Sequence, residues 1–233
     1  MNKVAILING VSAPIRKHNF LSICLEELGY EVVAINLVNE KVKFDSEVIN
    51  DFVKEKVNNK QIDLIMGWSM GAMVAPMIAV NYPKARLILV AGGVGHLNKL
   101  KYLKPILGVI KHGLYLPKEW LVNIYEKINP VGDGVKQKYR DQMNENIEFF
   151  RDIGTERMVE VFDFLAKVDN ESFFRKIKNR TLVMSGRNDK LLPIAEGQKI
   201  ANLVKGSRFV ITDGGHYNVI SRNELPIIKE FLK

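Results

Sequence analysis

One pentapeptide, Gly67-Trp68-Ser69-Met70-Gly71, constrains this chain more than any other stretch. The apolar run 62–66 that precedes it is typical of a buried strand, and the apolar stretch from about 70 to 81 is typical of a helix. A Gly-x-Ser-x-Gly sequence between a strand and a helix indicates a sharp turn with the serine at its tip. The two glycines leave room for the neighbouring strand and helix. The stretch therefore predicts a strand–turn–helix unit that presents Ser69 as a candidate nucleophile.

The rest of the chain alternates short apolar runs with helical patterns. The expected strands are 4–8, 31–37, 62–66, 86–91, 181–184 and 208–211, and the expected helices are about 17–28, 46–57, 70–81, 194–204 and 218–232. The strands are continuously apolar, which is typical of a parallel sheet covered on both faces. From His96 to about residue 178 the pattern is helical only. We therefore expect an α/β fold, with a mostly parallel six-stranded sheet flanked by helices.

The expected domain organisation follows from the place where the alternation stops. Residues 1–95 and 179–233 form the α/β core, and 96–178 form a helical cap inserted after the strand that follows the helix at 70–81. A chain of 233 residues is long enough for one domain carrying such an insertion.

Several classes of protein are disfavoured by the composition. No apolar run reaches the roughly 18 residues that span a bilayer, and the first apolar run is too short for a signal peptide, so we expect a cytoplasmic protein with no membrane association. The single cysteine, Cys24, cannot form an internal disulfide and lies in a helical apolar pattern, which predicts a buried thiol. The net charge is +8, but the lysines are scattered, so we expect acidic partners rather than nucleic acid.

Two loops carry polar residues that could serve Ser69. Ligands of parallel sheets bind at the carboxyl ends of the strands, where the loops 185–193 and 212–217 should converge. A serine nucleophile needs a base, and the base needs a carboxylate that orients it. Ser69, Asp189 and His216 supply these groups in the chain order that the strand–turn–helix arrangement requires.

The other histidines fit the role of base less well. His18 and His112 are not tied to a strand end, and His96 follows a strand but favours a structural or solvated role. His216 lies in a glycine-containing loop after the last strand. It is therefore the predicted base, with a structural histidine as the alternative.

The acid also has competing interpretations. Asp189 could instead cap the helix that follows Pro193. Asp213 is the nearest rival, but it precedes His216 by three residues on the same loop, which makes its approach to the imidazole awkward. We therefore predict Asp189 as the acid.

An acyl-transfer serine also needs hydrogen-bond donors for the developing oxyanion. The backbone N–H of Met70, directly after the nucleophile, is one candidate donor. The loop after the first strand should supply the other, most simply from Val11, with Ser12 as the runner-up. The alternative is that Asn9-Gly10 forms only a turn.

In these motifs the chain resembles the α/β-hydrolase superfamily over nearly its full length. The matching segments are Asn9-Gly10, where the family usually has His-Gly, Gly67–Gly71, Gly186–Asp189 with Pro193 four residues later, and Gly215-His216. The resemblance implies that the chain begins on the family's third strand, without the N-terminal hairpin. It also implies that 96–178 corresponds to the family's helical cap.

Within the superfamily, the Gly-Trp-Ser-x-Gly motif, the size and the cap length resemble small carboxylesterases of the pimeloyl-carrier-protein methyl ester esterase type. That resemblance implies that Trp68 lines the acyl pocket and binds substrate, with packing as the alternative. It also implies that basic cap residues meet an acidic carrier protein. Residues 96–140 hold nine Lys and Arg against three Asp and Glu, whereas 141–171 hold three against nine. A solvated helix face is the alternative explanation of this polarity.

We therefore expect a serine hydrolase that cleaves small-molecule carboxylic esters through an acyl-enzyme on Ser69. No metal or organic cofactor is implied. One alternative is an acyl-carrier-protein methyl ester esterase or thioesterase that uses the basic half of the cap. The other is a non-catalytic ligand-binding protein on a hydrolase scaffold.

Overall fold

A computed structural model describes residues 3–11, 20–95 and 136–233 of the chain. Six strands form one sheet in the order β2-β1-β3-β4-β5-β6, and every neighbouring pair is parallel. The strands are β1 (Lys3–Ile8), β2 (Tyr30–Ile35), β3 (Leu64–Trp68), β4 (Arg86–Val90), β5 (Thr181–Gly186) and β6 (Arg208–Thr212). The expected six-stranded α/β architecture is confirmed.

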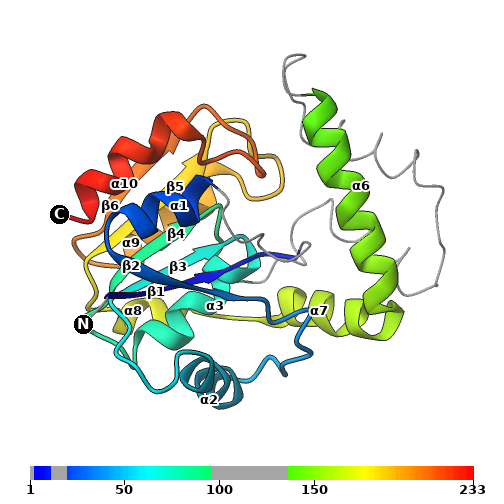
Figure 1. Cartoon of the computed structure of the whole chain (residues 1–233), viewed down its shortest axis with the longest axis horizontal. Helices are drawn as coiled ribbons and strands as arrows, with labels where there is room; N and C mark the ends of the chain where they lie inside the picture. Colours follow the sequence, from blue (N-terminus) through cyan, green and yellow to red (C-terminus); the bar gives the residue numbers. More distant parts are fainter. Residues whose placement is uncertain (1–2, 12–19, 96–135) are drawn as a thin grey trace.

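Helices cover both faces of this sheet (Figure 1). The described helices are α1 (Phe20–Glu27), α2 (Ser46–Lys56), α3 (Met70–Ala79), α6 (Lys136–Ile153), α7 (Thr155–Lys167), α8 (Glu171–Lys176), α9 (Ile194–Leu203), the 3-10 helix η3 (Arg222–Glu224) and α10 (Leu225–Phe231). Buried residues of α1 and α10 share one core cluster. Those of α2, α3, α8 and α9 belong to a second cluster on the other side of the sheet.

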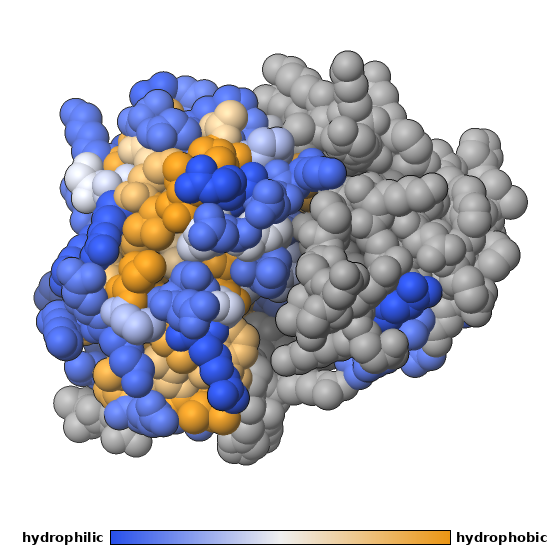
Figure 2. All heavy atoms as spheres, turned by 90° about the horizontal axis from the view of Figure 1, so that it is seen from above, coloured by the Kyte–Doolittle hydropathy of each residue, from blue (hydrophilic) through white to orange (hydrophobic). Residues whose placement is uncertain are grey.

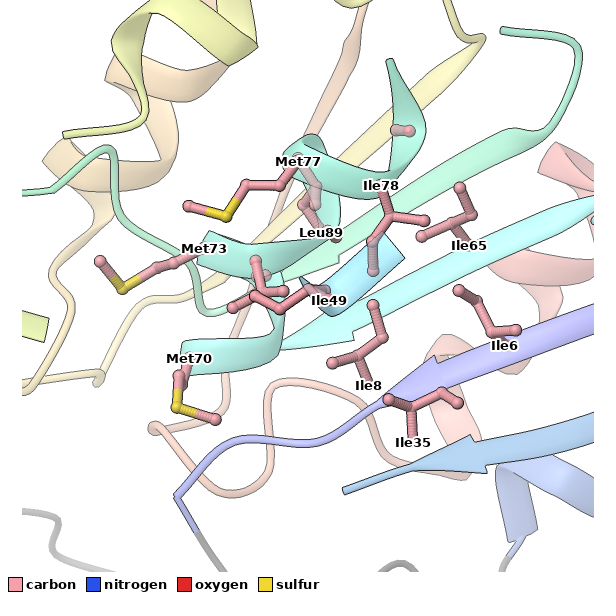
Figure 3. Close-up of a cluster of buried hydrophobic side chains, with 14 of the residues drawn as sticks. Ile6, Ile8, Ile35, Ile49, Ile65, Met70, Met73, Met77, Ile78 and Leu89 are labelled. Carbon is pink, nitrogen blue, oxygen red and sulfur yellow. The ribbon is translucent and has the colours of Figure 1, made fainter. Parts of the chain in front are cut away.

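The strands are apolar on both sides because each face is buried. In β1, Ile6 and Ile8 join the cluster with α3, whereas Ala5 and Leu7 join the cluster with α1 and α10. Successive side chains of a strand point to opposite faces, so a strand covered on both sides needs apolar residues throughout. Figure 3 shows Ile6 and Ile8 beside residues of α3, including Ile78.

Several boundaries differ by one or two residues from the sequence prediction, as in β2 and β5, and two of the differences have a visible structural reason. The third strand is shifted from 62–66 to β3, Leu64–Trp68. Asp63, just before it, accepts the Val4 N–H through its side chain at 2.8 Å, and Trp68 at the other end still pairs with Val90 of β4. The expected last helix, 218–232, is wrong over its first residues. Asn218 accepts the Gly215 N–H through Oδ1 at 2.7 Å, which makes 215–218 a turn.

The helical structure of this last segment begins instead at Arg222, with Ser221 as its N-cap. The Ser221 Oγ accepts the Asn223 N–H at 3.1 Å, and the Glu224 carboxylate accepts the Ser221 N–H at 2.7 Å. This reciprocal cap explains why η3 starts at Arg222 and continues into α10.

The predicted cap lies partly outside the described residues, which exclude 96–135. Of the rest, α6, α7 and α8 are helical as expected. Gly95 and Asp169 form an antiparallel bridge where the segment leaves and rejoins the core. The fully buried Phe174 of α8 packs in the core cluster that includes α3, and the Asn170 Nδ2 donates to the Met73 carbonyl oxygen at 2.5 Å.

Figure 2 shows one face, on which a band of hydrophobic residues is bordered by hydrophilic ones. The exposed large hydrophobic side chains of the described ranges are those of Phe20, Ile23, Val48 and Ile211. Among the described helices, none combines the length and apolar character needed to cross a membrane.

Candidate active site

Ser69 occupies the tip of the predicted turn. It lies between β3 and α3 with φ 55° and ψ −116°, a conformation that costs a non-glycine residue about 1–3 kcal/mol. Its N–H donates to the Val90 carbonyl oxygen at 2.9 Å, and its own carbonyl accepts the Ala72 N–H at 3.0 Å. The turn is therefore held on the β4 side and on the helix side.

Gly67 and Gly71 are needed because backbone atoms of neighbouring elements lie where their side chains would be. A Cβ on Gly67 would overlap the carbonyl oxygen of Gly71, and a Cβ on Gly71 would overlap the carbonyl oxygen of Ile8 in β1. The start of α3 therefore lies directly on the carboxyl end of β1. This packing confirms the steric reason for the two glycines.

Three predicted side chains meet beside this turn. The His216 Nε2 lies 2.9 Å from the Ser69 Oγ, and the His216 Nδ1 lies 2.8 Å from the Asp189 Oδ2. His216 and Asp189 are both buried. In the tautomer whose Nδ1 proton faces Asp189, the Nε2 lone pair faces the Ser69 hydroxyl and can accept its proton.

The two loops that carry the acid and the base are joined to each other. Their hydrogen bonds run from the Arg187 N–H to the Thr212 oxygen at 2.7 Å, from the Asn188 N–H to the Gly214 oxygen at 3.0 Å and from the Asn188 Nδ2 to the Asp213 oxygen at 2.8 Å. Asp189 directly follows the first of these bonded segments, and His216 follows the second by two residues. The hydrogen bonds therefore hold the loop of Asp189 beside the loop of His216.

Asp189 performs two structural tasks at once. Its Oδ1 accepts the N–H groups of Leu191 at 2.9 Å and Leu192 at 2.8 Å, while its Oδ2 faces His216. The turn-capping role and the His-facing role are therefore compatible. The rival Asp213 is largely exposed and pairs with the Arg187 Nε at 3.2 Å.

The loop after β1 passes against the serine. A Cβ on Gly10 would lie 2.8 Å from the Ser69 Cβ and 3.3 Å from its Oγ. The following residue, Val11, is half-buried, and Met70 is the buried first residue of α3. Both remain predictions as oxyanion donors, and the start of a helix favours negative charge at such a position. Ser12 lies outside the described residues.

The close approach of Gly10 to Ser69 was not predicted from the sequence. The available signal was the Asn9-Gly10 pair at the end of a strand, which predicts a tight approach as well as a turn.

Trp68 bonds to the loop that carries the base. Its Nε1 donates to the backbone carbonyl oxygen of His216 at 3.1 Å. The indole is half-buried and packs against the core cluster that contains Leu64 and Met66, its neighbours on the same face of β3. Its predicted contact with substrate stays a prediction beside this packing role.

The remaining candidates from the sequence are three histidines and the single cysteine. His18, His96 and His112 lie outside the described residues. Cys24 is buried as predicted, and burial raises the pKa of its thiol. Within the described ranges, no three His, Cys, Asp or Glu side chains form a group that could hold a metal ion.

Comparisons with known proteins find similar solved structures but no similar sequence family. No family model matches the chain, and no curated protein does so either. An enol-lactonase from Burkholderia xenovorans LB400 is similar, with a TM-score of 0.75 and 15% identity over 100% of this chain and 92% of that one. MenH from S. aureus has a TM-score of 0.72 and 20% identity, over 99% and 93% of the two chains.

A third similar structure is a bromoperoxidase from Bacillus anthracis, with a TM-score of 0.74 and 12% identity, over 100% of this chain and 92% of that one. These identities are low, so the likeness concerns the fold. It extends over nearly the whole length of each protein. The chain has the α/β-hydrolase fold.

Proposed function

We propose that this protein is a serine hydrolase that cleaves carboxylic esters through an acyl-enzyme on Ser69. The observation that carries the proposal is the continuous chain of contacts from the Ser69 Oγ through the His216 imidazole to the Asp189 carboxylate, at 2.9 and 2.8 Å. A serine hydroxyl becomes a competent nucleophile when a base accepts its proton and an acid orients that base.

The reaction proceeds in two halves. The Ser69 Oγ attacks the ester carbonyl while the His216 Nε2 takes its proton, and Asp189 stabilises the resulting imidazolium. The N–H groups of Met70 and Val11 hold the oxyanion. As the tetrahedral intermediate collapses, the alcohol leaves with the proton from His216.

Water completes the cycle. His216 removes a proton from a water molecule, and the water oxygen attacks the acyl carbon. Collapse of the second tetrahedral intermediate releases the carboxylic acid and returns the proton to the Ser69 oxygen. The ester has then gained one water molecule, and the enzyme is restored.

Two considerations favour an ester over simple ligand binding. A lactone is a cyclic ester, and one structural neighbour is named an enol-lactonase. A binding protein has no chemical need for a serine at φ 55° held against a buried His–Asp pair. The strained turn thus agrees with a catalytic function.

The test compares wild type and Ser69→Ala on p-nitrophenyl esters with acyl chains of increasing length. We expect turnover to fall to the uncatalysed rate, with an unchanged circular dichroism spectrum. Ser207→Ala, which alters a hydroxyl bonded to the Ala201 oxygen, is the matched control and should retain activity. Wild-type turnover by folded Ser69→Ala would refute the proposal.

A second assay, of methyl ester hydrolysis, addresses the carrier-protein alternative. If the cap binds an acidic carrier, a carrier-linked methyl ester should be hydrolysed faster than a free one, and added salt should reduce the difference. Equal rates for the two esters would rule out recognition of the carrier and favour a small-molecule esterase.

A further inference from the structure

Trp68 joins the strand of the candidate nucleophile to the loop of the candidate base. The residue directly precedes Ser69, and its indole Nε1 donates to the carbonyl oxygen of His216, 148 positions further along the chain, at 3.1 Å. The acceptor is the backbone oxygen of His216 itself. The hydrogen bond therefore restrains the backbone that carries the imidazole.

The turn around His216 is closed at both ends. The Asn218 N–H donates to the Gly215 carbonyl oxygen at 3.2 Å, and the Gly215 N–H donates to the Asn218 Oδ1 at 2.7 Å. These two bonds fix the shape of the turn. They do not fix its position relative to Ser69, which lies in the turn between β3 and α3.

The indole supplies such a positional link. Trp68 continues the face of β3 that carries Leu64 and Met66, both buried in the cluster with α1 and α10. A large flat side chain packed on this cluster has little rotational freedom, so its N–H is a fixed reference point. The next residue in the chain is Ser69, so the same backbone positions the nucleophile and this donor.

We propose that Trp68 is a positioning residue that holds the His216 imidazole within hydrogen-bond reach of Ser69 by binding the carbonyl oxygen of His216. This inference rests on the proposed hydrolase function. It assigns the indole N–H a role in the geometry of proton transfer. A wall of the acyl pocket would act differently, by contacting the substrate.

The two roles make different kinetic predictions. A misplaced base weakens proton transfer for every substrate, and small displacements of catalytic groups lower rates by up to about 100-fold. A pocket wall changes the binding of particular acyl chains, which alters KM and the preference for chain length.

The experiment measures kcat and KM of Trp68→Phe for p-nitrophenyl esters of several chain lengths. Phenylalanine keeps an aromatic ring but lacks the N–H donor. We expect kcat to fall by about 10- to 100-fold for all chain lengths, with KM unchanged within about twofold. The matched control is Met66→Leu, on the same face of β3 and in the same cluster, which should keep wild-type kinetics.

A second variant guards against simple misfolding of Trp68→Phe. Incorporation of 3-benzothienylalanine at position 68, in a Trp120→Phe background, replaces the indole N–H by sulfur and preserves the shape of the side chain. The same uniform loss of kcat, relative to the Trp120→Phe background, would support the proposal.

Two outcomes overturn the inference. One is an unchanged kcat in the folded variants, and the other is a change confined to KM and chain-length preference. Failure of the proposed function is distinct, because wild type itself would then hydrolyse no ester.

Discussion

The guanidinium Nη2 of Arg157 in α7 lies 2.6 Å from the backbone carbonyl oxygen of Leu37, in the loop after β2. Nη2 also donates to the Val42 oxygen at 2.6 Å, Nε donates to the Val38 oxygen at 3.2 Å, and the guanidinium lies over the ring of Phe44 at 4.8 Å. The side chain is buried. A buried cation is tolerated when its donors are satisfied. These hydrogen bonds therefore add to the apolar packing of Val161 and Leu165 in holding α7 on the core.

We therefore predict that Arg157→Met lowers the free energy of unfolding by about 3 kcal/mol, because three buried carbonyl groups lose a charged donor. Urea denaturation measures the loss. The control is Arg175→Met, which removes an exposed pair with Glu171 and should cost less than about 1 kcal/mol. Equal losses in the two variants would show that Arg157 does not anchor α7.

Asp189→Asn should preserve the turn at 189–192 and lower the rate of ester hydrolysis. The Asn Oδ1 can still accept the N–H groups of Leu191 and Leu192. Its Nδ2 then donates to the His216 Nδ1, which leaves the proton on Nε2 and prevents His216 from accepting the Ser69 proton. We expect kcat to fall by about 10⁴-fold, as in a serine protease with this change. The assay is ester hydrolysis by protein whose melting temperature is unchanged, and a loss below tenfold would contradict the assigned role.

Gly10→Ala should affect activity more than stability. The added Cβ would lie 2.8 Å from the Ser69 Cβ and 3.2 Å from the Trp68 carbonyl oxygen, so the serine or the loop must move. We expect kcat to fall at least about tenfold.

The matched control for that variant is Gly29→Ala. At Gly29 φ is +81° and the new Cβ would meet nothing within 4 Å. This substitution should cost stability, about 1–2 kcal/mol, and leave kcat unchanged. Kinetics and thermal unfolding of both variants test the contrast, and a wild-type kcat in Gly10→Ala would argue against a close approach of this loop to the serine.

The sheet and the contacts among Ser69, His216 and Asp189 could be predicted because their signals are local. Strands buried on both faces are apolar at every position, and polar residues just after such strands must meet at one edge of the sheet. Asp189 and His216 could therefore be placed beside Ser69 from chain order alone. The serine turn was equally predictable, since its two glycines are demanded by contacts within the motif and with β1.

Other features depend on partners distant in sequence. Arg157 lies in an amphipathic helix, where an arginine normally indicates a solvated face, and its carbonyl partners are more than 110 positions away. The late start of the last helix depends on the Asn218 side chain, which bonds backward to Gly215. The Trp68 hydrogen bond to His216 spans 148 positions. None of these has a periodic signature in the sequence.

The central claim is that Ser69 is a nucleophile activated by His216. Incubation with a fluorophosphonate probe, followed by intact mass and peptide mapping, measures this directly. The account predicts one covalent adduct on Ser69 in wild type, no adduct in Ser69→Ala and strongly slowed labelling in His216→Gln. A folded wild-type protein that acquires no label, or acquires it on another serine, would contradict the account.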